Sequence, residues 1–85
     1  MYYLYVLKSR KDELLYIGST NDLRRRLADH NSGKVQSTMS RRPFEIRYYE
    51  AYISESDARK REASLKRDGR ALSQLKNVSL NVCNR

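Results

Sequence analysis

The sequence predicts an α+β fold: a small, three-stranded, mostly antiparallel sheet flanked by helices. Two observations support this. Three short runs rich in tyrosine, valine, isoleucine and leucine have the composition of strands, and other segments carry apolar residues at helical spacing. The expected order is β-β-α-β-α-α, at residues 2–8, 14–18, 22–31, 44–52, 54–68 and 70–77.

The first predicted strand, YYLYVLK at residues 2–8, is an unbroken apolar run, which is typical of a central strand covered on both faces. We expect it to form a hairpin with residues 14–18 around a four-residue loop at 9–12. This register places Tyr5 opposite Tyr16, so that both tyrosines share one face. A slip of one residue would separate their hydroxyls.

The first helix is predicted over residues 22–31, because good N-cap residue types precede it and Gly33 is suited to end it. Leu23 and Leu27 mark its buried stripe, and His30 lies between them in angle. The following residues, 34–43, form a basic loop, and FEIRYYEAY then alternates as a third strand should.

The second helix carries an acid where its pattern expects an apolar side chain. At about 100° per residue, Ala58, Glu62 and Leu65 fall within roughly 60° of one another, on the only apolar stripe of the helix. Basic residues occupy the rest of its surface. A carboxylate on that stripe must be paired or must bind something. One interpretation is an ion pair with Lys66 at i,i+4, and the other is a functional site.

The composition favours a polyanionic partner. The chain has 18 Lys and Arg against 10 Asp and Glu, a net charge of +8, and Arg outnumbers Lys. Arginine binds phosphate in bidentate geometry, which favours nucleic acid. The longest apolar run is far shorter than the roughly 20 residues that span a bilayer. We therefore expect no membrane partner and a cytoplasmic location.

Several motifs occur together. The triplet Tyr16-Ile17-Gly18 lies within LYIGSTNDLRRRLADHNSGK, and the triplet Tyr3-Leu4-Tyr5 precedes it. The motifs RRP (41–43) and KREASLKR (60–67) follow. In combination these motifs resemble the GIY-YIG nucleases, most closely the small single-domain members, with Tyr3 in the position of the first signature glycine. The resemblance covers residues 2 to about 76, so we expect a nuclease-like domain over residues 1–76 and a flexible tail over 77–85. The VQSTMS segment departs from those members, which affects substrate grip or preference.

The resemblance implies a set of catalytic residues. One signature tyrosine would be the general base, Arg26 would contact the scissile phosphate, and Glu62 would hold one weakly bound divalent ion, Mg²⁺ or Mn²⁺. Gly18 would be needed either for the backbone conformation at the end of its strand or to let another group approach the backbone closely. The matched catalytic positions are Tyr5, Tyr16, Arg26, His30, Glu62 and Lys66.

Each of these residues also has a structural interpretation. Buried tyrosines are commonly core residues with satisfied hydroxyls. Arg26 on its own would be a surface arginine bonded to Asp22, and His30 is equally suited to helix packing and to proton transfer. The remaining cations are expected to form a solvated surface that attracts DNA without any one being essential. This nucleic-acid-binding set comprises Arg24, Arg25, Lys34, Arg41, Arg42 and Arg59.

Three functions follow from these observations. The first is a Mg²⁺-dependent nuclease that hydrolyses DNA, directed by substrate shape and of low sequence specificity, since we expect no second domain for target recognition. The second is a non-catalytic nucleic-acid-binding module on the same scaffold. The third is a small basic protein–protein adaptor. A homodimer or a partner protein would supply selectivity. The inward acid Glu62 favours the nuclease, because simple phosphate binding does not need an acidic residue.

Overall fold

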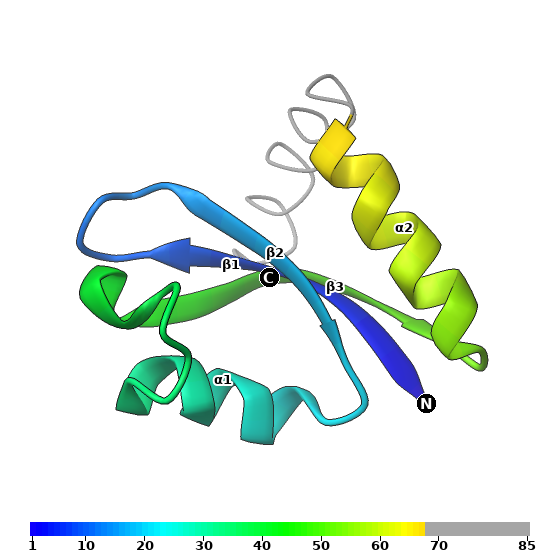
Figure 1. Ribbon diagram of the computed structural model, residues 1–85, viewed down its shortest axis with the longest axis horizontal. Helices are drawn as coiled ribbons and strands as arrows, with labels where there is room; N and C mark the ends of the chain where they lie inside the picture. Colours follow the sequence, from blue (N-terminus) through cyan, green and yellow to red (C-terminus); the bar gives the residue numbers. More distant parts are fainter. Residues whose placement is uncertain (68–85) are drawn as a thin grey trace.

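The computed structural model describes residues 1–67, which form a three-stranded sheet with a helix on each face (Figure 1). Both strand pairings are antiparallel, and the order β2-β1-β3 places the first strand in the centre, as predicted. The elements are β1 (Tyr2–Ser9), β2 (Leu15–Thr20), α1 (Leu23–Ser32), the 3₁₀ turn η1 (Met39–Arg41), β3 (Phe44–Tyr52) and α2 (Glu55–Arg67).

The predicted helix at 70–77 and the expected flexible tail at 77–85 lie outside the described residues. Within residues 1–67, no helix is both long and apolar enough to cross a membrane.

Two apolar clusters, one on each face of β1, make up the core. Leu4 and Val6 pack with Leu65 of α2, whereas Tyr5 and Leu7 lie on the other face, towards α1. All four β1 side chains are 2% exposed or less. Burial on both faces explains why this strand is apolar without alternation.

The predicted hairpin register is wrong by two residues. Tyr5 pairs with Gly18, and Tyr16 pairs with Leu7. The second strand starts at Leu15, and Leu14, which we expected inside it, is 62% exposed. Because side chains alternate with a period of two, a shift of two residues keeps both tyrosines on the same face. Their ring centroids lie 6.4 Å apart.

Local hydrogen bonds in the turn set the observed register. The Ser9 hydroxyl accepts the amides of Lys11 and Asp12, each at 3.1 Å, and the Asp12 carboxylate accepts the amide of Leu14 at 2.9 Å. Glu13 adopts a positive φ of 62°. These bonds satisfy the turn backbone over a longer loop than the four residues predicted. Hydrophobic pattern alone does not encode them.

Helix α1 begins and ends close to the predicted residues. The side chain of Asp22 caps it by accepting the amide of Arg25 at 3.1 Å, and Gly33 ends it in the left-handed conformation with φ of 84°. Near its C-terminus, Asn31 binds the backbone of Phe44 through both its oxygen and its nitrogen, at 2.6 and 3.1 Å. This contact fixes the end of α1 against the start of β3.

Helix α2 is attached to β3 by a half-buried polar cluster centred on Glu50. The hydroxyls of Tyr48 and Tyr52 donate to its carboxylate at 2.6 and 2.5 Å, and Arg61 donates through two nitrogens at 3.0 and 3.3 Å. Burial alone would raise the pKa of Glu50, but these hydrogen bonds outweigh it and hold the pKa below its ordinary value. Burial and the bond to Glu50 raise the pKa of Tyr48 to about 12.

We predict that Glu50→Gln lowers the free energy of unfolding by about 1–3 kcal/mol, because hydrogen bonds to a charged acceptor are lost. Since the pKa of Glu50 is depressed on folding, its contribution is present above pH 4.5 and is lost as the pH falls through the folded value. Urea unfolding at pH 7 and pH 3.5 measures both effects. Glu45→Gln, at a partly exposed ion pair in which Glu45 accepts from one nitrogen of Arg47, should cost less than Glu50→Gln because fewer hydrogen bonds are lost. An equal loss of unfolding free energy in the two variants would show that Glu50 has no special role in stability.

Candidate active site

The Tyr5 hydroxyl lies at the centre of the candidate site. It is hydrogen-bonded to Nε2 of His30 at 2.9 Å and accepts from Nε of Arg26 at 3.4 Å. Arg26 and His30 are four residues apart on α1, so they extend from the same face of the helix. The tyrosine comes from the central strand and is 2% exposed. Strand β1 and helix α1 thus assemble three predicted residues around one oxygen.

The hydrogen bonds around His30 define its tautomer. Its Nδ1 lies 2.8 Å from the Thr38 hydroxyl, and that hydroxyl donates to the carbonyl oxygen of Val35 at 3.4 Å. Thr38 therefore accepts from the Nδ1 hydrogen, and Nε2 is left as the acceptor for the hydroxyl hydrogen of Tyr5. His30 and Thr38 are both fully buried. The donors are aligned in one direction, from Arg26 through Tyr5 and His30 to Thr38.

The surroundings keep both the phenol and the imidazole neutral at pH 7. Burial raises the pKa of Tyr5 above its ordinary value, and the hydrogen bond and charge of Arg26 oppose that shift without reversing it. Burial and the nearby charge of Arg26 lower the pKa of His30 from its usual 6.5. A neutral imidazole with a free Nε2 lone pair is a suitable proton acceptor.

Gly18 provides the space that the Tyr5 hydroxyl occupies. A Cβ atom at residue 18 would lie 2.5 Å from the hydroxyl oxygen and 2.6 Å from the ring carbon that carries it. No side chain fits at such distances without displacing the ring. The close approach expected at this glycine therefore involves the phenol of Tyr5, its partner across the hairpin.

Glu62 reaches the next residue of the same strand, from the other face. Its Oε1 accepts from the Ser19 hydroxyl at 2.7 Å and its Oε2 accepts from Lys66 at 2.7 Å. The i,i+4 ion pair and the inward orientation are therefore both present. Gly18 and Ser19 are consecutive, so Tyr5 and Glu62 approach edge strand β2 from opposite faces. The charge of Glu62 also contributes to raising the pKa of Tyr5.

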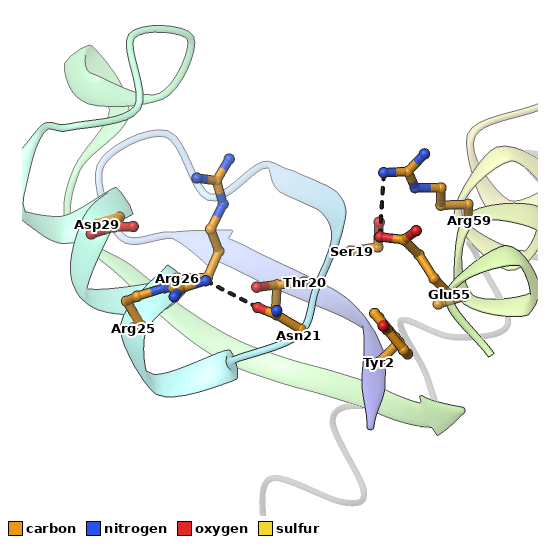
Figure 2. A pocket seen from close by; sticks show the side chains of 10 residues that line it. Tyr2, Ser19, Thr20, Asn21, Arg25, Arg26, Asp29, Glu55 and Arg59 are labelled. Atoms are coloured by element: carbon orange, nitrogen blue, oxygen red, sulfur yellow. Dashed lines mark hydrogen bonds and ion pairs between the residues drawn. The ribbon is translucent and has the colours of Figure 1, made fainter. Parts of the chain in front are cut away.

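A groove of about 290 Å³ runs between α1 and α2 across the end of β2 (Figure 2). Arg26 lies on its α1 side and Arg59 on its α2 side, with Ser19 and Thr20 between them. The other lining residues are Tyr2, Asn21, Arg25, Asp29, Glu55 and Ala58. Ala58 is one helical turn before Glu62, and Ser19 donates a hydrogen bond to the Glu62 carboxylate. The groove therefore adjoins the Tyr5 and Glu62 sites.

The predicted nucleic-acid-binding cations separate into two groups. Arg25 and Arg59 line the groove, where they bind Asn21 at 3.0 Å and Glu55 at 3.4 Å, both at exposed positions. Arg24 is exposed on α1 beside a separate hollow. These arginines are placed so that a polyanion can reach them.

The other predicted cations come after α1 in the sequence. Lys34 is 75% exposed and lies 3.9 Å from Asp29. Arg41 donates to Asp12 at 2.7 Å, which holds the pKa of that carboxyl at about 2, and packs over Phe44. Arg42 donates to the Met39 carbonyl oxygen at 2.8 Å. Arg41 therefore joins the loop to the β1–β2 turn, whereas the bond of Arg42 lies within the loop itself.

The acidic side chains of residues 1–67 show what kind of metal site the protein could form. Within residues 1–67, no group of three or more His, Cys, Asp or Glu side chains is placed to hold a metal ion. Glu62 is the carboxylate that the sequence predicts as the metal ligand, and each of its oxygens accepts one hydrogen bond and keeps a further lone pair. A single carboxylate fits Mg²⁺, which retains several waters and binds substrate phosphate. The donor set is compatible with one weakly bound divalent ion.

Comparison with known proteins identifies the family. The GIY-YIG catalytic domain family matches residues 1–77. The chain belongs to the GIY-YIG family. It is 48% identical over 69 residues to a UPF0213 protein of Streptococcus pneumoniae, an alignment that covers 80% of this chain and 69% of the relative. A UPF0213 protein of Bacillus pumilus is 46% identical over 66 residues, covering 76% of this chain and 66% of the relative.

A solved structure supports the same GIY-YIG assignment. The solution NMR structure of a UPF0213 protein from Bacillus halodurans matches this chain with a TM-score of 0.58 and 33% identity, covering 92% of this chain and 85% of that one. The GIY-YIG family indicates a nuclease-like function, and nucleases of this family generally use divalent metal ions.

Two residues of the candidate site were not found from the sequence. Thr38 fixes the His30 tautomer from within a loop that we interpreted only as basic. Ser19 follows the YIG triplet directly and binds Glu62. Its position next to the motif was the one available signal, whereas Thr38 lies in the segment that departs from the family pattern and gave none.

We predict that His30, the single histidine of the chain, titrates below pH 6.5 with its proton on Nδ1. Because its pKa is lower in the folded chain, the associated stability is present above pH 6.5 and is lost as the pH falls towards the folded value. Imidazole ¹⁵N and ¹H NMR measures the pKa and the tautomer. Arg26→Gln should raise this pKa, since a nearby positive charge is removed. Arg24→Gln, at an exposed position, should leave it unchanged, and a wild-type value above 6.5 would contradict the prediction.

Proposed function

We propose that this protein is a Mg²⁺-dependent nuclease that hydrolyses phosphodiester bonds of DNA. The observation that carries the proposal is the aligned hydrogen-bond chain from Arg26 through Tyr5 to a neutral His30. A core tyrosine needs only one partner to satisfy its hydroxyl, yet this one has a cation on one side and a buried base on the other. That arrangement suits proton transfer better than packing.

In the proposed step, the Tyr5 oxygen takes a proton from the attacking water while its own hydroxyl proton passes to Nε2 of His30. The water becomes hydroxide-like, the phenol is restored and the imidazole becomes positively charged. Because the pKa of Tyr5 is raised by burial, a stable tyrosinate before attack is disfavoured, and a concerted transfer avoids it. Thr38 continues to accept from Nδ1 and keeps the ring in place.

The charges around the groove suit the phosphate. Arg26 uses Nε for Tyr5 and retains its two terminal nitrogens, which would donate to the non-bridging phosphate oxygens. Glu62 would hold the divalent ion, and Ser19 and Lys66 orient its carboxylate. When bound, the ion supplies positive charge at the phosphoryl oxygens. Lys66 lies close enough to Glu62 to contribute to the same field.

The proposed substrate preference is for DNA shape. Binding through backbone phosphates carries little sequence information, so affinity should fall with salt, and selectivity should follow nicks, flaps or branches. A homodimer or a partner protein would add further selectivity. A non-catalytic nucleic-acid-binding module uses the same cations, and it is distinguished from a nuclease by cleavage.

Glu62→Ala should abolish cleavage and leave salt-dependent DNA binding nearly intact, because the groove cations remain. The measurement uses labelled single-stranded, duplex, flapped and branched DNA with Mg²⁺, Mn²⁺ or EDTA. Glu45→Ala, which removes an acid on β3 that does not line the groove, is the matched control and should cut like the wild type. Cleavage by Glu62→Ala at the wild-type rate would remove this acid from the mechanism, and binding without cutting by the wild type would favour the module.

Tyr5→Phe should reduce the cleavage rate by about 10²–10⁴, the usual contribution of a positioned acid–base group. Tyr16→Phe should reduce it less. The Tyr16 ring packs on His30 with centroids 5.0 Å apart, and within residues 1–67 its hydroxyl has no hydrogen-bond partner. Single-turnover rates at saturating enzyme separate chemistry from binding. A larger loss for Tyr16→Phe would assign the general base to that tyrosine.

A further inference from the structure

A second hollow, of about 460 Å³, lies beside the N-terminal half of α1 and is separate from the catalytic residues. Tyr3 and Tyr49 come from neighbouring strands, and Leu23 and Leu27 come from α1. The other lining residues are Asn21, Asp22, Arg24 and Ile46. Its volume is in the range of sites that hold small organic ligands. We call this the tyrosine hollow.

Tyr49 is the feature of the tyrosine hollow that a folding role does not explain. It is 55% exposed, although it lies in the middle of β3, and its ring is packed edge-on against Tyr3 with centroids 6.2 Å apart. The contact holds the ring in place and leaves more than half of the residue accessible. A fixed, exposed aromatic ring above aliphatic side chains is a suitable surface for a planar ring to stack on.

Arg24 gives the hollow a charge that complements a nucleotide. It is exposed, and it forms no ion pair or hydrogen bond with another side chain in the described part of the protein. The acid beside it, Asp22, is occupied as the cap of α1. Stacking surface and available guanidinium together match a base and its phosphate. An apolar peptide would use the ring but not the cation.

The tyrosine hollow adjoins the groove. Asn21 lines both, and Tyr3 pairs in the sheet with Thr20, which lines the groove. A DNA strand bound across the groove would therefore lie next to the hollow.

We propose that the tyrosine hollow binds an unpaired nucleobase of the DNA substrate, stacked on Tyr49 with a flanking phosphate on Arg24. The inference rests on the proposed nuclease function and specifies its substrate class: DNA with an unpaired nucleotide close to the bond that is cut. In a continuous duplex every base is stacked inside the helix and cannot enter the hollow. The Tyr49 contact would then add to affinity only where a strand is unpaired.

The test is the affinity of the full chain for fluorescein-labelled DNA, measured by anisotropy in EDTA so that binding needs no cleavage. The two probes are a blunt duplex and the same duplex with a single-stranded flap. Tyr49→Ala should weaken flap binding at least about fivefold and leave blunt-duplex binding within about twofold, because stacking needs an unpaired base. Tyr49→Phe, which keeps the ring, should bind as the wild type does. Ile53→Ala removes an 88% exposed apolar residue outside the hollow and should change neither affinity.

The outcomes separate this inference from the proposed function. Equal wild-type affinity for both probes, or equal losses on both for Tyr49→Ala, would overturn the inference and leave the nuclease proposal standing. No binding of either probe by the wild type would contradict both. Tyr49→Leu keeps apolar volume on the strand and serves if the alanine variant does not fold. Tight flap binding by the leucine variant would also overturn the inference.

Discussion

The arrangement of the site depends on one constraint: the hydroxyl of Tyr5 is buried and must be hydrogen-bonded. Central strand β1 places it there because the strand is covered on both faces. An unpaired hydroxyl at that depth would cost about 1–3 kcal/mol. Helix α1 therefore supplies His30 and Arg26, and β2 supplies a glycine where a larger residue would displace the phenol. The same contacts satisfy the buried hydroxyl and form the hydrogen-bond chain on which the proposed proton transfer rests.

The inward acid Glu62 depends on a separate set of contacts on the opposite face of the sheet. Glu50 binds Arg61, the residue before Glu62, and thereby sets how α2 lies on β3. Ser19 then receives the carboxylate at the edge strand. The two halves of the site meet at two consecutive residues of β2, so small shifts of either helix would separate them.

The cations divide between architecture and recognition. Arg41 and Arg61 are engaged by carboxylates within the fold, whereas among residues 1–67 Arg24 has no such partner and Arg26 uses only its Nε, for Tyr5. Net charge alone therefore overstates the surface available to a polyanion. The positions of the available cations, along a groove and beside an exposed aromatic ring, are consistent with the proposed substrate, a DNA with an unpaired nucleotide beside a duplex.

The sequence by itself determined the elements and the chemical types. Apolar runs and caps located three strands and two helices within a few residues, and the inward Glu62 followed from helical periodicity alone. The structure decided what depends on particular hydrogen bonds, both within a turn and between distant residues. The hairpin register was set by side-chain bonds of Ser9 and Asp12 within the turn, and the His30 tautomer was set by a threonine from a loop. Periodicity reports which face a residue occupies. It carries no information about which partner meets it there, because hydrogen bonds across the fold follow from packing.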